Sequence, residues 1–132
     1  MMVRQNEWQC PCESGLAYLA CCGPLLSRTT HAETAEALMR SRYTAYVRND
    51  LDYLQSTWHP EYRPEKLPDI DNQKWLGLKI RRVEGGDKGS LEGIVEFVAR
   101  FKSGSMGSRL NEISRFVWEA DRWYYTTGEF VE

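Results

Sequence analysis

Residues 10–23 read CPCESGLAYLACCG, and this stretch holds every cysteine of the 132-residue chain. The pattern is two cysteines separated by one residue, a spacer of eight residues, and then two adjacent cysteines: Cys10, Cys12, Cys21 and Cys22. Because the chain has no other cysteine, these four thiols bond to one another, share a ligand or stay free. Their chemistry therefore decides how the N-terminal end of the chain folds.

Three arrangements of the thiols fit this spacing. In the first, four thiolates surround one metal ion tetrahedrally, with two close pairs brought together by a short loop. In the second, two disulfides form, and Cys21 and Cys22 each bond back to the first pair because a vicinal disulfide distorts its peptide. In the third, the thiols are free and one or two are catalytic. Clustered cysteines in an intracellular chain indicate metal binding more often than a disulfide framework.

The expected ion is zinc, with ferrous iron as the alternative because it also accepts four thiolates. His31 lies in the linker that follows the cysteines. It could replace a cysteine as a ligand, but four thiolates already close a tetrahedral site. We therefore expect His31 at the surface.

The residues between the cysteine pairs favour a compact knuckle. Ser14 and Gly15 are typical of a turn that aims backbone N–H groups at the sulfurs. Residues 16–20 have the length of about one and a half helical turns. Gly23-Pro24 is predicted to end that helix.

Two helices are expected after the knuckle. The first runs to about Arg48, and its apolar residues recur with the helical period. Thr30 with Glu33 fits a capping box at its start, and Thr34 is the rival N-cap. Asn49 or Asp50 caps a second, shorter helix, which ends at His59-Pro60 because proline disfavours helix at the preceding residue.

A run of strands follows an irregular segment over residues 60–70, after which Asp71 is predicted to cap a turn carrying Trp75. The period of two predicts strands over residues 76–84, 91–102, 110–118 and 122–127, with a hairpin loop over 104–108 and a tight turn at Ala120-Asp121. Helices followed by antiparallel strands indicate an α+β domain. We expect the helices to pack on one face of a curved sheet, which makes a cone. Two units result, a metal-binding knuckle over residues 1–24 and the α+β domain over 25–132.

Composition and charge argue against several classes of protein. The formal net charge is −2, which is not the basic excess of a nucleic-acid binder. The N-terminus has no apolar segment of a signal peptide, and no apolar run approaches the roughly 20 residues that span a bilayer. With reduced cysteines, the expected location is the cytoplasm. Lys79, Arg81 and Arg82 alternate imperfectly and predict a solvated strand face.

The cysteine segment resembles the SEC-C motif of the SecA preprotein translocase tail, whose usual form is C-P-C-G-S-G, a basic pair, an aromatic residue and a final C-C or C-H. The rest of the chain resembles the YchJ family of small bacterial proteins. The matching segments are Cys22-Gly23-Pro24-Leu25, TAEALMRSRY at residues 34–43, Thr57-Trp58-His59-Pro60, Trp75-Leu76-Gly77-Leu78 and Ser114-Arg115-Phe116. This resemblance implies a nuclear-transport-factor-2-like (NTF2-like) cone behind the metal motif, and it implies no particular activity.

Two departures from the usual motif affect the partners that the resemblance implies. Glu13 stands where the motif has glycine, and Leu16-Ala17 replaces the basic pair. In the SecA tail, the basic face helps bind the chaperone SecB and the ribosome. The resemblance therefore implies a protein partner, but this chain does not reproduce the basic pair.

A cone of this kind often keeps a pocket between helix and sheet. The candidate pocket residues are Arg42, Tyr43, Tyr46, His59, Trp75, Glu112 and Arg115, together with the aromatic residues Trp58, Trp118, Trp123 and Tyr125. The alternative is that the aromatic residues simply fill the core. His59 is either a general base or a helix C-cap.

Arg42 and Arg115 lie among apolar positions, and a buried guanidinium needs a partner. They form either structural ion pairs or an anion-binding pocket. The candidate carboxylate partners are Glu36, Glu96 and Glu112.

Three functions remain at this point. The first is a non-enzymatic adaptor that presents the metal knuckle to a protein partner, with the cone carrying or dimerising it. The second is a small-molecule-binding protein or enzyme that uses the cone pocket, although we expect no turnover from this domain alone. The third, contact with nucleic acid or the ribosome, requires basic residues to cluster on one face.

Overall fold

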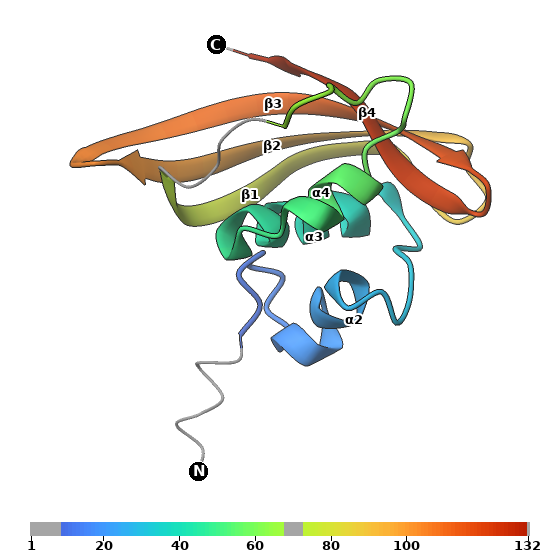
Figure 1. Cartoon of the computed structure of the whole chain (residues 1–132), viewed down its shortest axis with the longest axis horizontal. Coiled ribbons are helices and arrows are strands. Elements are labelled where there is room, and N and C mark those ends of the chain that lie inside the picture. The colour runs from blue at the N-terminus through green and yellow to red at the C-terminus, as the bar shows by residue number, and fades with distance from the viewer. Residues whose placement is uncertain (1–8, 68–72, 132) are drawn as a thin grey trace.

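A computed structural model describes residues 9–67 and 73–131 of the chain. A 3-10 helix, η1 (Tyr18–Ala20), is followed by the helices α2 (Gly23–Leu26), α3 (Ala35–Arg48) and α4 (Leu51–Ser56). Four strands complete the chain: β1 (Gln73–Gly85), β2 (Glu92–Ser103), β3 (Met106–Glu119) and β4 (Arg122–Phe130) (Figure 1). The turn predicted at Asp71 lies outside the described residues.

The helix starts follow from local capping. The Thr34 side chain accepts a hydrogen bond from the amide of Ala37 at 3.0 Å, so Thr34 is the N-cap of α3 and the predicted capping box at Thr30 is wrong. Asp50 caps α4 in the same way, accepting from the Tyr53 amide at 3.0 Å. The prediction for Gly23-Pro24 is also wrong. Pro24 lies in the first turn of α2, where proline needs no N–H partner, so this pair begins a helix rather than ending one.

The strands pair antiparallel in the order β1-β2-β3-β4. The expected loop over residues 104–108 shrinks to two residues, because Ser103 pairs with Met106 and the hairpin continues to its tip. Ala120 and Asp121 connect β3 to β4 with φ angles of 54° and 63°. Two successive residues with positive φ make the tight turn that matches the twist of a hairpin.

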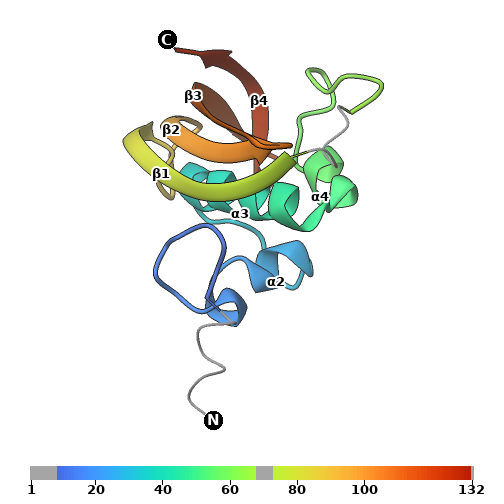
Figure 2. The same cartoon turned by 90° about the vertical axis from the view of Figure 1, so that its left-hand side faces the viewer.

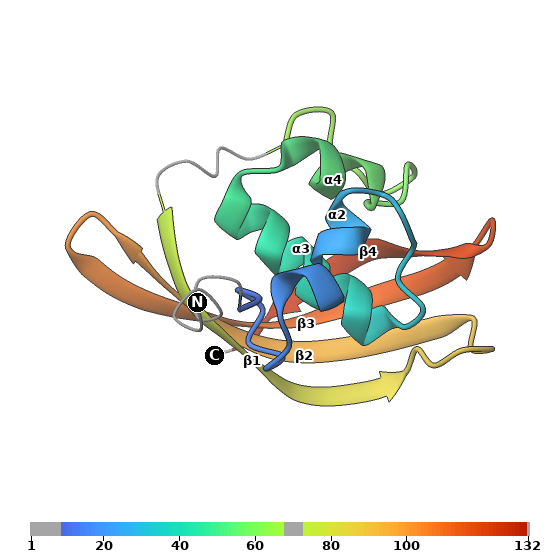
Figure 3. The same ribbon diagram turned by 90° about the horizontal axis from the view of Figure 1, so that it is seen from below.

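Helix α3 packs on the concave face of the sheet, with α4 against its side (Figures 1 and 2). The cone core includes Leu38 from α3, Val95 and Phe97 from β2, Phe116 from β3 and Trp123 from β4, all at most 5% exposed. The expected α+β cone is therefore confirmed. Helix α3 has a second neighbour, because the cysteine segment and α2 lie on the side of the helix that faces away from the sheet (Figures 1 and 3).

The cysteine segment shares its interior with the cone. Cys10, Cys12 and Cys22 belong to the same cluster of buried residues as Leu38. The division into two units at residue 24 stays a prediction. Within the part of the chain that the structure describes, no helix combines the length and apolar character needed to cross a bilayer.

Candidate metal centre

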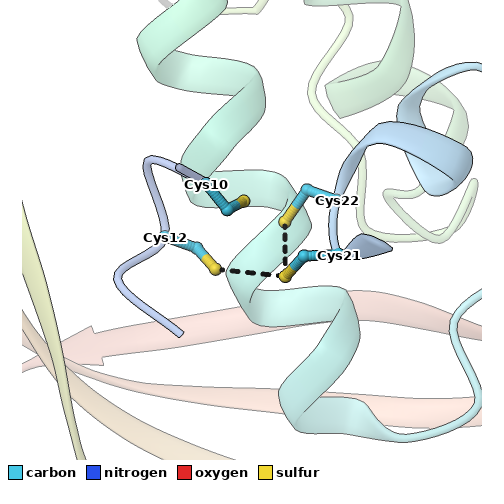
Figure 4. Close-up of side chains that lie close together, drawn as sticks. All are labelled: Cys10, Cys12, Cys21 and Cys22. Carbon is cyan, nitrogen blue, oxygen red and sulfur yellow. Dashed lines mark hydrogen bonds between the residues drawn. The ribbon is translucent and has the colours of Figure 1, made fainter. Parts of the chain in front are cut away.

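The four cysteine sulfurs converge on one point beside α3 (Figure 4). All four lie within 4.8 Å of one another, and none is in a disulfide. The sulfur of Cys21 lies 3.6 Å from that of Cys12 and 3.9 Å from that of Cys22. A tetrahedral ion with metal–sulfur bonds of about 2.3 Å holds its sulfurs about 3.8 Å apart. The donor set and spacing therefore fit one tetrahedral metal ion.

The backbone of the first pair folds into a tight loop. The Cys10 amide donates to the carbonyl of Leu16 at 3.0 Å, and the Glu13 amide donates to the carbonyl of Cys10 at 3.2 Å. Glu13 adopts a left-handed conformation with φ of 63°. Glycine takes this conformation without steric strain, which explains why the usual motif has glycine at this position.

The second pair lies where η1 ends and α2 begins. The Cys21 amide donates to the carbonyl of Tyr18 at 3.0 Å, which closes the 3-10 turn. The carbonyl of Cys22 accepts from the amide of Leu26 at 2.9 Å, which opens α2. Adjacent cysteines therefore both reach the cluster because the chain changes direction between them.

Hydroxyl groups surround the sulfurs. The Thr44 hydroxyl, from α3, donates to the sulfur of Cys22 at 3.4 Å and lies 3.8 Å from the sulfur of Cys10. The Ser14 hydroxyl lies 3.1 Å from the sulfur of Cys21. Hydrogen bonds of this kind stabilise thiolates and orient them toward an ion. Sequence reasoning placed Ser14 in this turn but missed Thr44, whose signal is a polar residue on the buried face of a helix.

The cluster distributes its protons unevenly. Hydrogen bonds from Cys10 and Cys22 hold the pKa of the Cys12 thiol far below its usual range. Hydrogen bonds with Cys10 and Cys12 raise the pKa of Cys22, and burial raises that of Cys21 to about 11. Cys12 is thus the thiolate that its neighbours stabilise. A metal ion that binds all four sulfurs must displace the remaining protons.

Side chains from both sides tie the knuckle to the cone. Arg40, on α3, donates to the carbonyl of Cys12 at 2.8 Å and forms an ion pair with Glu36 at 3.0 Å. The Glu13 carboxylate accepts from the Leu78 amide of β1 at 3.2 Å. The knuckle is therefore positioned by α3 and by the first strand of the sheet.

The predicted pocket residues divide into groups, and the first group surrounds Arg42. This guanidinium donates to the carbonyl of Leu54 at 2.9 Å and to the hydroxyl of Thr57 at 2.7 Å. It lies 4.4 Å from the ring centre of Tyr125 and 5.3 Å from that of Trp58. The expected carboxylate partner of Arg42 is thus replaced by backbone, hydroxyl and aromatic groups.

Glu112 lies beside this group. Its carboxylate accepts from the Tyr125 hydroxyl at 3.1 Å and from the Ser114 hydroxyl at 2.7 Å. Burial and the Glu112 charge raise the pKa of Tyr125, so the phenol keeps its proton and donates it. The result is a connected polar network inside the cone.

The second group is aromatic. The Trp75 ring packs against Tyr43 at 5.9 Å, Tyr46 at 5.6 Å and Phe101 at 5.2 Å between centroids. The indole N–H of Trp75 is buried and finds no hydrogen-bond partner among the described residues. These rings fill space between α3 and the β1–β2 end of the sheet. Elsewhere, Trp118 packs edge-on against Trp123 at 5.6 Å between centroids.

His59 and Arg115 lie apart from both groups. His59 accepts from the Glu61 amide through Nδ1 at 3.1 Å, so its Nε2 carries the proton and donates to Glu119 at 3.0 Å. The Arg115 side chain is 52% exposed and pairs with Glu129 at 3.6 Å, on the strand face opposite Glu112. Glu36 and Glu96 pair with other arginines, and His31 is exposed as expected.

Comparison with known proteins agrees with this architecture. The family model described as "YchJ, middle NTF2-like domain" matches residues 34–128. A UPF0225 protein of Chromobacterium violaceum is 48% identical over 129 residues, covering 95% of this chain and 95% of the relative. A UPF0225 protein of Pectobacterium carotovorum is 47% identical over 93% of this chain and 84% of its own length.

A solved structure matches both parts of the chain. The solution structure of a SEC-C motif containing protein from Rhodopseudomonas palustris superposes with a TM-score of 0.81 at 42% identity. The match covers 93% of this chain and 98% of that protein. The four-cysteine cluster, the cone and these relatives together show that the chain belongs to the YchJ family, in which a SEC-C motif precedes an NTF2-like domain.

Proposed function

We propose that this protein is a zinc-binding adaptor that presents its SEC-C knuckle to a protein partner. The observation that supports this is that the knuckle buries cysteines and exposes leucines, the reverse of an ordinary hydrophobic core. Among its described residues, 9–24, the buried side chains are those of cysteines, while Leu16 and Leu19 are 53% and 68% exposed. Large apolar side chains that face solvent close together are typical of contact surfaces.

Two hollows flank these leucines. One, of about 490 Å³, is lined by Tyr18, Leu19 and Pro24 among others, and the second, of about 340 Å³, is lined by Leu16, Leu25 and Ala37 among others. Exposed leucines beside such hollows suit a partner that inserts apolar side chains of its own. The SecA tail contacts SecB and the ribosome with the help of its basic pair, which this chain lacks. We therefore expect a partner that is recognised through apolar contacts instead. A second copy of the chain is one such partner.

The zinc assignment follows from the ligand chemistry. Four cysteines leave a tetrahedral ion no open position, which is typical of structural zinc and unlike catalytic sites that keep a position for water. The bound ion would hold the two cysteine pairs together and neutralise part of the thiolate charge. Thiolate ligands stay reduced in the cytoplasm, which is where we place the protein.

The alternative, a ligand-binding or catalytic cone, has weaker support. The two candidate bases are already engaged, His59 with Glu61 and Glu119, and Glu112 with Ser114 and Tyr125. A general base must be free to take a proton from a substrate.

The test is affinity capture with the zinc-loaded protein and two matched variants. Leu16→Ser with Leu19→Ser should lose the partner while keeping one equivalent of zinc. Leu91→Ser is the control, because Leu91 is 70% exposed but lies far along the chain, before β2. A partner that both variants lose equally, or that neither loses, would contradict the adaptor proposal, and purified protein with under half an equivalent of zinc would contradict the metal assignment.

A further inference from the structure

The outer face of the sheet, turned away from α3, carries an unusual arrangement of charge. In the strand register, Lys74 lies directly opposite Lys102, and Arg100 lies directly opposite Arg109. Trp75 points inward to Tyr43 and Tyr46, so its neighbour Lys74 and the paired Lys102 point outward. Like charges directly opposite each other destabilise a sheet. Two such pairs side by side need an explanation other than stability.

More cations join these pairs. A hollow of about 410 Å³ is lined by Lys79, Arg81, Arg100 and Arg109, with Leu78, Val98 and Glu13. We call the following set the basic face: Lys74, Lys79, Arg81, Arg100, Lys102 and Arg109. All six are exposed. They are a third of the 17 lysines and arginines of a chain whose net charge is −2, so the positive charge is concentrated here.

The other end of the same sheet face behaves differently. There Arg82 pairs with Glu96 at 3.4 Å, and Arg115 pairs with Glu129 at 3.6 Å. Among the described residues, the six members of the basic face form no ion pair. Glu13 is the one carboxylate in the lining of the hollow, and it already accepts from the Leu78 amide. Glu13 offsets part of the charge beside Arg100, because its carboxylate and the Arg100 guanidinium both lie against Gly77. Among the described residues, the rest of the basic face has no carboxylate partner.

We propose that the basic face binds the phosphodiester backbone of a nucleic acid. Measured along the unbroken β2, the face runs from Lys102, opposite Lys74, to just beyond Phe97, opposite Ile80. These five to six residues extend about 17–20 Å, which is longer than one small anion requires. Six cations are spread over three neighbouring strands within that length, a charge density that suits the phosphates of a nucleic-acid strand, which repeat about every 3.4 Å. An acidic peptide reaches that density only when nearly every residue is acidic.

The composition of the face also indicates how it binds. Three of its six residues are arginines, whose planar guanidinium groups match phosphate oxygens. The hollow is lined by no aromatic ring, so it offers no platform for stacking bases. Contacts to phosphates position a protein without reading sequence. Binding should therefore be independent of sequence and strongly dependent on salt. This role is separate from the leucine surface of the knuckle.

The experiment is a fluorescence anisotropy titration of the full, zinc-loaded chain with a labelled mixed-sequence RNA of about 20 nucleotides, single-stranded and as a duplex, between about 50 and 200 mM salt. Arg100→Gln with Arg109→Gln should weaken binding about tenfold or more and lower the salt slope by about 1.4 to 1.8, the value for two lost phosphate contacts. Lys66→Gln with Lys88→Gln removes the same charge from exposed sites outside the basic face and should change binding little.

The remaining outcomes contradict the proposal. Absence of binding by the wild type at low salt, equal losses in both double variants, or tighter binding to a poly-glutamate peptide than to either RNA would each overturn it. Removing the opposed arginines should leave the melting temperature unchanged or raise it, because their repulsion is relieved. If that variant does not fold, Lys79→Gln with Lys102→Gln tests the same face.

Discussion

The knuckle and the cone lie on opposite sides of α3 and bury different kinds of side chain. In the cone, the fully buried side chains include Leu38, Val95 and Phe116, so apolar side chains fill its centre. In the part of the knuckle that the structure describes, the buried side chains are those of cysteines, and the leucines face solvent. A segment of this size cannot bury enough apolar surface to fold by itself. The cone is thus expected to fold by hydrophobic burial and the knuckle by ligand binding.

The sharpest way to break this comparison is to remove the sulfurs. Cys21→Ser with Cys22→Ser should abolish metal binding, whose apparent free energy in small structural zinc sites is about 10–16 kcal/mol. The knuckle should unfold while the cone keeps its structure, because α3 and the sheet have their own core. Elemental analysis measures the metal, and circular dichroism with a melting curve measures the cone. Global unfolding of this variant would show that the two regions form one cooperative unit.

The converse change acts on the cone. Phe116 is 1% exposed and packs edge-on against Tyr125 at 5.7 Å between centroids. Phe116→Ala should lower the free energy of unfolding by about 3–5 kcal/mol, from lost burial and the cavity left behind. Urea denaturation measures the loss, and protein that remains folded should still hold one equivalent of zinc. The exposed Leu91→Ala is the control, and a loss below about 1 kcal/mol for Phe116→Ala would contradict the assigned core.

The two regions should also respond to opposite ends of the pH scale, the cone losing stability at alkaline pH and the knuckle losing its ion at acid pH. Burial raises the pKa of Tyr53 in the folded cone to about 12, whereas an unfolded tyrosine titrates near 10. The Tyr53 phenol therefore contributes stability that is fully present below about pH 10 and is lost as pH rises through about 12. The knuckle, in contrast, should release its ion as pH falls, because protons compete for the thiolates.

A pH series of melting curves and zinc release checks this prediction. In Tyr53→Phe, the alkaline loss of stability should begin at higher pH, while acid release of zinc should be unchanged. A variant that shifted both transitions together would show that the regions do not titrate independently.

The smallest expected effect comes from the junction between the regions. Glu13→Gly places glycine at a left-handed backbone position, where glycine is less strained than glutamate. It also removes the hydrogen bond that the Glu13 carboxylate accepts from the Leu78 amide. The two effects oppose each other, so the net change in stability should stay within about 1 kcal/mol. Hydrogen exchange at the Leu78 amide should accelerate in Glu13→Gly and stay near wild type in Glu13→Gln, which keeps an acceptor. Unchanged exchange in Glu13→Gly would show that the knuckle is not held at β1.

Local chemistry made much of this architecture predictable. The cysteine spacing indicates one cluster, and the helical and alternating periods indicate two helices followed by four strands. Each of these patterns is formed by residues that are close together in the chain, so it can be recognised without knowing which distant segments pack together. The same reasoning was wrong where two local signals compete. At Gly23-Pro24, glycine indicates a helix end and proline a helix start, and the structure places both residues in the first turn of α2.

By itself, the sequence determined the four thiols, the order of the elements and the fold class. Tertiary structure alone brought Thr44 to the sulfurs and enclosed Arg42 between Tyr125 and Trp58 in place of a carboxylate. Tertiary structure also decided which cations lie together on the basic face. β1 changes register between Trp75 and Gly77 and between Ile80 and Arg82, so simple alternation cannot assign Lys79 and Arg81 to a side of the sheet. A shift of one residue moves a side chain to the opposite face, and register is set by pairing with a partner strand.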